Sequence, residues 1–294
     1  MVRLALVGGT GVFHALAFGG LVNGTAPGKS VPDGWPDYPQ SVENARITVV
    51  WDEDRAAAEK LAEVFGIEHV ADTLEAVVPH CDGVIVTVDA TAQHYRHAPF
   101  FLERGIPTFI DKPLAPDAKT AQSLVELAAK HGTPLMSGSA LRYAAESEAL
   151  RANPDLLGRI ELATAFGPND LFNYGLHPLE LAHSIMGGGI ATVRNVGTQD
   201  QDIVKVTYHD GRTLILIISR VLKFAFEITF YGTDGRQSVV VSDDTAYYSN
   251  QLRQIATMIR DRKTPYPIED AVEVIRILEA GVLSLQQGGK EIAL

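Results

Sequence analysis

Short apolar runs alternate with helix-like spacing through the first half of the chain. The predicted strands cover residues 2–7, 47–51, 83–88, 108–110 and 134–137. The predicted helices between them cover residues 12–22, 55–65, 93–105 and 118–130, where apolar positions recur on one face. Gly66 and Gly132 are helix stop signals, and Asp117 is a start signal. Strands separated by helices predict an α/β domain with a doubly wound parallel sheet.

The second half has a different rhythm, in which strands follow one another with few helices between them. The predicted strands cover residues 160–166, 192–197, 203–209, 212–219 and 225–231. Hairpin signals lie at His209-Asp210-Gly211-Arg212 and Gly232-Thr233-Asp234-Gly235. Two closing helices are predicted at residues 250–263 and 268–287. We therefore expect two domains, residues 1–143 and 144–294, the second being α+β with a mostly antiparallel open sheet.

The strand around Leu214 to Ile218 is apolar on both of its faces. One face can pack on the helices of its own domain, so the other face needs a second cover. A partner subunit is the natural cover and predicts a homodimer or homotetramer through the C-terminal sheet. A loop or helix from the same chain is the alternative.

Composition narrows the classes of partner and compartment. The chain of 294 residues has a formal net charge of -11, which argues against nucleic acid as its main partner. No apolar run approaches the ~20 residues of a membrane span, so we expect a soluble protein that does not bind membranes. The single cysteine, Cys81, cannot form an intramolecular disulfide, and this fits the cytoplasm.

Glycines follow the first predicted strand and open a helix. Gly9, Thr10, Gly11, Val12 and Phe13 stand where a dinucleotide-binding fold needs a tight turn close to a pyrophosphate. The third glycine of that fingerprint is replaced by His14. The turn predicts a Rossmann domain, and an ordinary strand-to-helix turn is the alternative.

Asp52 ends the second strand, where a carboxylate can accept hydrogen bonds from the adenosine ribose. It lies further than the usual ~20 residues beyond the glycines, and an inserted loop at residues 23–40 explains the excess. A carboxylate there repels a 2′-phosphate and favours NAD over NADP, although Arg55 softens the preference. Asp52 could instead cap the helix that begins near Arg55.

Asp111-Lys112-Pro113 ends another strand, on the sheet edge where such folds bind ligands. The proline forces Lys112 into an extended conformation and so fixes its direction. A lysine beside a cationic nicotinamide would have a lowered pKa, which suits proton handling near neutral pH. A solvated lysine in a turn is the alternative.

These motifs together resemble the Gfo/Idh/MocA family, which includes glucose–fructose oxidoreductase and inositol dehydrogenase. The glycine turn, the strand end at Asp52 and the Asp111-Lys112-Pro113 motif come first. Arg142-Tyr143 resembles the Arg-Phe pair that opens the second domain of that family. Asn173-Tyr174-Gly175-Leu176-His177 resembles its Asp-x-Gly-x-His motif, and residues 231–235 resemble its late Gly-Thr-x-Gly turn.

The resemblance implies an oxidoreductase that transfers hydride between NAD and a hydroxyl-bearing carbon of a sugar, polyol or related small molecule. His177 would take the hydroxyl proton, and Lys112 would hydrogen-bond the substrate oxygen. Asn173 would orient His177. The further cofactor-binding residues that the resemblance implies are Thr87, Asp89, His94, Asp111 and Arg142.

Asn173 stands where the family has an aspartate, so the charge that would stabilise a protonated His177 is missing. Asp170 or Glu180 could replace that carboxylate. Two other functions stay open: a dinucleotide-sensing protein without catalysis, and a glycosidase that oxidises its substrate transiently at tightly held NAD. His94 and His97 have a spacing that could bind metal, but no carboxylate or cysteine motif accompanies them, and we predict no metal site.

Overall fold

The computed structural model describes residues 1–88 and 93–294, so Asp89 lies outside the described residues. The described chain divides into two compact units. The first contains Met1–Gly138 and Tyr248–Ile268, and the second contains Ser139–Tyr247 and Glu269–Leu294.

The first unit is built on a parallel sheet of six described strands in the order β3-β2-β1-β4-β5-β6. These strands are β1 (Val2–Val7), β2 (Ala45–Trp51), β3 (His69–Val70), β4 (Gly83–Val86), β5 (Thr108–Ile110) and β6 (Leu135–Ser137). The helices are α1 (Phe13–Asn23), α2 (Arg55–Phe65), α3 (Leu74–Val77), η1 (Val78–His80), η2 (His94–His97), α4 (Ala98–Leu102) and α5 (Ala118–His131). The predicted doubly wound parallel sheet is confirmed.

Close packing explains why glycines interrupt α1. A Cβ added at Gly19 would lie 2.3 Å from the ring of Phe65 on α2, and one at Gly20 would lie 3.1 Å from the carbonyl oxygen of Tyr38.

The predicted helix at residues 93–105 is shorter in the structure. A 3-10 turn over His94–His97 precedes α4, which carries Pro99 in its first turn. Proline lacks the N–H of a helix interior and is tolerated where a helix begins.

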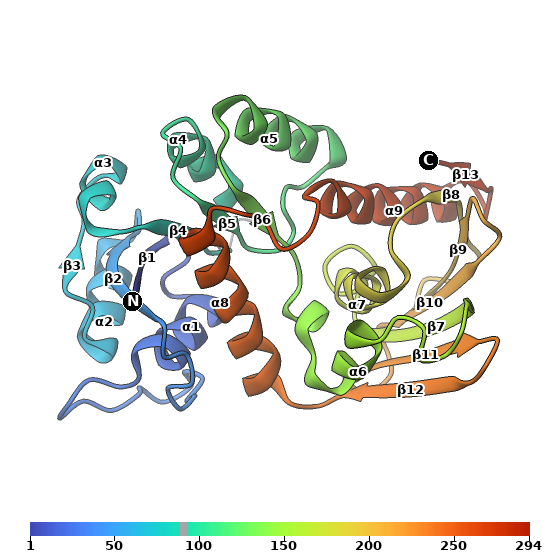
Figure 1. Cartoon of the computed structure of the whole chain (residues 1–294), viewed down its shortest axis with the longest axis horizontal. Coiled ribbons are helices and arrows are strands. Elements are labelled where there is room, and N and C mark those ends of the chain that lie inside the picture. The colour runs from blue at the N-terminus through green and yellow to red at the C-terminus, as the bar shows by residue number, and fades with distance from the viewer. Residues whose placement is uncertain (89–92) are drawn as a thin grey trace. The chain divides into compact units, whose positions relative to one another are not determined.

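Most of the long helix α8 (Asp244–Asp261) belongs to the first unit, although it follows most strands of the second unit in the sequence. Its Gln251 side chain donates a hydrogen bond to the Gly138 carbonyl at 2.8 Å, and the hydroxyls of Ser249 and Ser41 are 2.5 Å apart. Figure 1 shows α8 beside α1. The N-terminal segment of the first unit therefore ends at Gly138 and not at the expected residue 143. The unit also includes residues 248–268, which we expected in the second domain. A periodic pattern shows that a segment is helical but not which sheet it packs on.

The second unit contains a sheet of seven described strands in the order β12-β11-β7-β10-β9-β8-β13. These are β7 (Ile160–Pro168), β8 (Ile190–Asn195), β9 (Gln201–Tyr208), β10 (Thr213–Ser219), β11 (Phe226–Gly232), β12 (Arg236–Val241) and β13 (Ile292–Ala293). Its helices are η3 (Ala140–Tyr143), η4 (Ala145–Ser147), α6 (Glu148–Ala152), α7 (Leu176–Met186) and α9 (Glu269–Gln286). Among the described strands the pairs are antiparallel apart from β7 with β10, so the predicted mostly antiparallel sheet is confirmed. Both predicted hairpins form.

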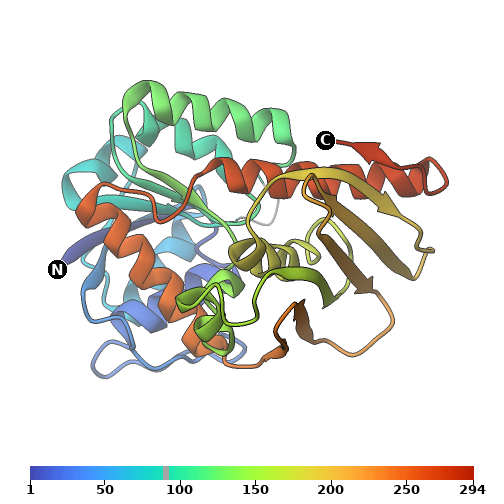
Figure 2. The ribbon, with the colours of Figure 1, turned by 45° about the vertical axis from the view of Figure 1, so that its right-hand side comes forward.

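Helices α7 and α9 pack on the second sheet, as Figure 2 shows. The strand β10 alternates accordingly: Leu214, Leu216 and Ile218 are buried in the core, whereas Ile215 and Ile217 are only partly buried. One face of β10 is therefore covered by the core, and the described residues leave its other apolar face partly exposed.

Among the described residues, no helix is both long and apolar enough to cross a membrane.

Candidate functional site

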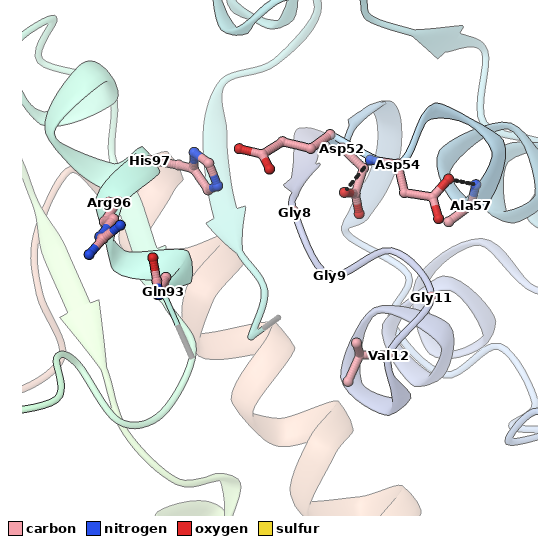
Figure 3. A pocket seen from close by; sticks show the side chains of 11 residues that line it. Gly8, Gly9, Gly11, Val12, Asp52, Asp54, Ala57, Gln93, Arg96 and His97 are labelled. Carbon is pink, nitrogen blue, oxygen red and sulfur yellow. Dashed lines mark hydrogen bonds between the residues drawn. The ribbon is translucent and has the colours of Figure 1, made fainter. Parts of the chain in front are cut away.

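A pocket of about 480 Å³ lies at the carboxyl ends of β1, β2 and β4 in the first unit (Figure 3). Its lining residues are Gly8, Gly9, Gly11, Val12, Asp52, Glu53, Asp54, Ala57, Gln93, Arg96 and His97. Gly9 has a φ of 60° and lies so close to the strand end that an added Cβ would be 2.1 Å from the Val88 carbonyl oxygen. The turn thus requires glycine at this position, because other residues would clash and would be strained at that φ.

Asp52 lines this pocket and also holds the glycine turn in place. One of its carboxylate oxygens accepts hydrogen bonds from the Thr10 N–H at 2.7 Å and from the Thr10 hydroxyl at 2.6 Å. The residue that caps α2 is Asp54, whose side chain accepts from the Ala57 N–H at 3.1 Å. Asp52 is therefore not the helix cap, and its carboxylate remains at the position expected for a ribose contact.

Helix α1 begins at the pocket without a side-chain cap and without an acidic residue in its first turn. The N–H groups of a helix start carry partial positive charge and bind phosphate groups when no side chain satisfies them. Phe13 is the first residue of α1 and is 46% exposed, whereas Thr87 is fully buried and its hydroxyl donates to the Gly8 carbonyl. The turn, the helix start and Asp52 together fit the diphosphate and ribose of a dinucleotide.

Lys112 lies just beyond the carboxyl end of β5, and polar groups hold its backbone. Its N–H donates to Asp111 Oδ1 at 2.8 Å. The buried His94 places Nε2 3.0 Å from the Asp111 carbonyl oxygen and 3.3 Å from that of Pro113. Sequence reasoning gave His94 a cofactor-binding role, and the structure places it beneath this loop.

His14, at the third glycine position of the fingerprint, forms an ion pair with Asp111. Its Nδ1 is 2.5 Å from Asp111 Oδ2, and the Asp111 side chain is almost fully buried. Burial alone would raise the pKa of Asp111, but the charge and hydrogen bond of His14 and the charge of Lys112 hold it well below its usual range.

His177 lies in the first turn of α7 in the second unit, where its Nδ1 is 2.7 Å from the hydroxyl of Ser139. Asn173 instead donates from both its backbone and its side-chain nitrogen to Asp170 Oδ1, at 2.8 and 3.0 Å. Among the described residues no hydrogen bond joins Asn173 to His177. Ser139 carried no signal that singled it out in the sequence, because a serine is common in such turns.

Arg142 is buried in the second unit and forms an ion pair with Glu180, at 2.7 Å between Nη1 and Oε2. A second, longer contact of 3.5 Å joins it to Asp270 on α9. Burial raises the pKa of Glu180 even though Arg142 opposes the shift. Glu180, one of the two expected substitutes for the missing carboxylate, is thus engaged with Arg142, and the other, Asp170, holds Asn173.

Comparison with known proteins identifies the first unit. Residues 21–139 match the model of the Gfo/Idh/MocA family, described as an oxidoreductase family with an NAD-binding Rossmann fold. Most of the Rossmann domain is therefore similar to this family. The match begins after the glycine turn, so the evidence for the turn as part of a dinucleotide site comes from the structure and not from the family match.

Relatives of this chain include the myo-inositol dehydrogenase Hyg17 of Streptomyces leeuwenhoekii. It is 37% identical over 114 residues, which are 38% of this chain and 35% of Hyg17. The alignment thus spans about a third of the length of that curated relative.

Solved structures extend the likeness in fold to the whole chain. The myo-inositol dehydrogenase of Corynebacterium glutamicum has a TM-score of 0.80 and 21% identity, covering 100% of this chain and 99% of that one. The myo-inositol dehydrogenase of Lactobacillus casei, solved with NAD(H) and myo-inositol, has a TM-score of 0.80 and 15% identity, covering 100% and 97%. The chain therefore shares the fold of these structures over its whole length.

Of the predicted site residues, Gly9, Gly11, Val12 and Asp52 line this pocket, whereas Thr10 and Phe13 are not among its lining residues. The sequence analysis did not predict the other lining residues: Gly8, Glu53, Asp54, Ala57, Gln93, Arg96 and His97. Position was the available signal, since all seven follow the carboxyl ends of β1, β2 and β4. Among the described residues no group of three or more His, Cys, Asp or Glu side chains could hold a metal ion.

Proposed function

We propose that this chain is an NAD-dependent dehydrogenase that acts on a hydroxyl-bearing carbon of a sugar, polyol or related small molecule. One observation carries the proposal: the pocket of the first unit joins a helix start suited to phosphate with a carboxylate suited to ribose. The curated relative is named a myo-inositol dehydrogenase, which supports a polyol as the substrate.

NAD is favoured over NADP because the rim of the pocket is acidic. Asp52, Glu53 and Asp54 all line it, and a 2′-phosphate beside them would be repelled. Arg96 also lines the pocket, while Arg55 pairs with Glu59 at 2.8 Å and with Asp72. Those carboxylates engage Arg55, which weakens the reason for expecting it to accept a 2′-phosphate.

When bound, the nicotinamide of NAD accepts or donates the hydride. Lys112 would donate a hydrogen bond to the substrate oxygen and stabilise its negative charge. His177 would accept the hydroxyl proton at Nε2, because Nδ1 is the ring nitrogen engaged with Ser139. For this tautomer Nδ1 must carry a proton and donate to the Ser139 oxygen, which also accepts from the Leu141 N–H at 3.1 Å. We therefore assign the orientation of His177 to Ser139.

The other predicted site residues differ in the contacts that support their proposed roles. Thr87 donates to the Gly8 carbonyl and His94 contacts the Lys112 loop, and we propose that both support the cofactor site. Phe13, exposed at the start of α1, keeps its proposed contact with the cofactor. Arg142 and Asn173 have intramolecular partners that support a structural role beside any contact with the cofactor or substrate.

Titration of the purified chain with NADH and, separately, NADPH tests the proposal, followed by a screen of inositols and sugars for NAD reduction. We expect NADH to bind more tightly, and Asp52→Asn to weaken it by about ten-fold or more, since a charge-assisted hydrogen bond contributes ~1.5–3 kcal/mol. His177→Ala should lower kcat by roughly 10²–10⁴-fold with little change in NADH affinity. Absence of binding to either dinucleotide would refute the proposal.

A dinucleotide-binding protein without catalysis is the second candidate. Asn173 favours it, because it stands where the family has an aspartate and a neutral amide stabilises an imidazolium less than a carboxylate does. NADH binding without turnover of any screened substrate, and with no effect of His177→Ala, would select this candidate. Retention of NAD through purification without its net consumption would point to the transient-oxidation glycosidase.

We further propose that the second sheet pairs with a second copy of the chain. Its open face carries partly buried or exposed apolar side chains from neighbouring strands: Phe166, Ile203, Ile215, Ile217 and Val240. Ile217→Lys would place a charge at the centre of this face. Light scattering should show a dimer or tetramer for the natural chain and a smaller species for the variant, and a monomeric natural chain would refute the pairing.

A further inference from the structure

The loop that carries Lys112 is held by hydrogen bonds on both sides of that residue. His94 is fully buried, and its Nε2 lies 3.0 and 3.3 Å from the carbonyl oxygens of Asp111 and Pro113. Carbonyl oxygens only accept, so Nε2 carries the proton, and Nδ1 of His94 has no hydrogen-bond partner among the described residues. The carbonyl groups of the residues before and after Lys112 are thus bound to one rigid ring.

The Asp111 side chain supplies a third attachment. Its Oδ1 accepts from the Lys112 N–H at 2.8 Å, and its Oδ2 accepts from His14 Nδ1 at 2.5 Å and from the Val88 N–H at 3.3 Å. A carboxylate that is almost fully buried needs a charged or strongly donating partner to stay ionised. His14 is that partner, and its charge helps to keep the Asp111 pKa low against the effect of burial.

The His14 ring is itself fixed from two directions. It stacks on Phe18, one turn further along α1, with ring centroids 5.7 Å apart and an interplanar angle of 18°. Its Nε2 is 3.3 Å from the Tyr248 hydroxyl on α8, and its side chain is 12% exposed. The position that a dinucleotide fingerprint gives to glycine therefore carries a side chain anchored to both α1 and α8 and aimed at Asp111.

We propose that His14 is a positioning residue for Lys112, acting through the Asp111 carboxylate. Together with His94 it clamps the backbone on which the Lys112 side chain depends for its direction. The proposal rests on the proposed function, in which Lys112 contacts the substrate oxygen. A displacement of about 1 Å in a reacting group can lower a rate a hundred-fold, so a fixed backbone here has a direct effect on turnover.

Two substitutions of His14 separate this role from cofactor binding. His14→Gly restores the usual glycine, so the affinity for NADH should stay within about two-fold, while kcat should fall by roughly ten-fold or more. His14→Asn should recover most of kcat, because its side-chain amide can donate to Asp111 from a position close to that of Nδ1. His131→Gly, at the exposed end of α5, is the matched control and should leave both quantities unchanged.

Amide hydrogen exchange of Lys112, followed by NMR, gives a readout that does not depend on activity. We expect slow exchange in the natural chain and in His14→Asn, and faster exchange in His14→Gly. If His14→Gly does not fold, His14→Phe keeps a ring against Phe18 while removing the donor, and it should show the same faster exchange.

Unchanged exchange at Lys112 in a folded His14→Gly or His14→Phe chain would overturn the clamp, and so would an unchanged kcat. Failure of the natural chain to bind NADH would instead refute the proposed function, while the exchange measurement would still decide whether His14 holds the Lys112 backbone.

Discussion

Each unit buries one carboxylate beside a residue expected to act in catalysis, and the two carboxylates are held in opposite ways. Asp111 in the first unit accepts hydrogen bonds from His14 and from two backbone N–H groups, and its pKa is lowered. Glu180 in the second unit accepts from Arg142, and burial raises its pKa. Both carboxyl groups are buried, but the positive charges of His14 and Lys112 outweigh burial at Asp111, whereas at Glu180 burial and the negative charge of Asp270 outweigh Arg142.

The difference extends to the functional side chains. Lys112 depends on a charged pair and on His94, all within the first unit, whereas His177 is paired with the neutral Ser139 hydroxyl. Removing a donor from a buried charge is costly, while removing a neutral hydrogen bond has a modest effect. Removing the groups that bind the Lys112 backbone should therefore have a larger effect than removing the Ser139 hydroxyl beside His177.

The largest effect is expected for Arg142→Leu. Glu180 would remain buried without its partner, and the free energy of unfolding should fall by about 3–5 kcal/mol. Denaturant unfolding measures the loss, and the double variant Arg142→Leu with Glu180→Leu should recover most of it. If the single variant were as stable as the natural chain, Glu180 would not depend on Arg142 for its burial. NADH affinity of the double variant tests the predicted cofactor role of Arg142.

A smaller effect is expected for Ser139→Ala. The lost hydrogen bond is neutral and contributes ~0.5–1.5 kcal/mol, so kcat should fall by about two- to ten-fold, with KM for the substrate less affected. Ser139→Thr keeps the hydroxyl and serves as the conservative comparison. A fall as large as that of His177→Ala would mean that Ser139 takes part in the proton transfer itself.

The smallest effect is a change in how stability depends on pH. Asp111 has a folded-state pKa below its ordinary value of 3.8. Its stabilising contribution to the free energy of unfolding is therefore present above pH 3.8 and is lost as the pH falls below that value. Glu180 has a folded-state pKa above its ordinary value of 4.5. Its stabilising contribution to the free energy of unfolding is therefore present below pH 4.5 and is lost as the pH rises above that value.

Thermal unfolding between acid and neutral pH measures both contributions. Glu180→Gln removes the opposing one, so stability should fall more steeply on acidification than it does in the natural chain. Asp111→Asn should make the dependence shallower. Parallel curves for the two variants would show that the two carboxylates do not differ as the structure indicates.

The amino-acid pattern alone determined the alternation of strands and helices in the first unit, the antiparallel sheet of the second, and the glycine turn followed by Asp52. These features depend on local periodicity, on turn residues and on strand ends, and the carboxyl ends of parallel strands must meet at one edge. The same pattern indicated that β10 is apolar on both faces, because side chains alternate along a strand.

Only the tertiary structure decided which side chains meet across long separations. Ser139 lies 38 residues before His177, and His14 lies 97 residues before Asp111, so no spacing rule joins either pair. The return of α8 to the first unit, which brings Tyr248 to His14 across 234 residues, is likewise invisible in periodicity. Helical spacing gives a segment an apolar face, and packing against the rest of the chain decides what that face meets.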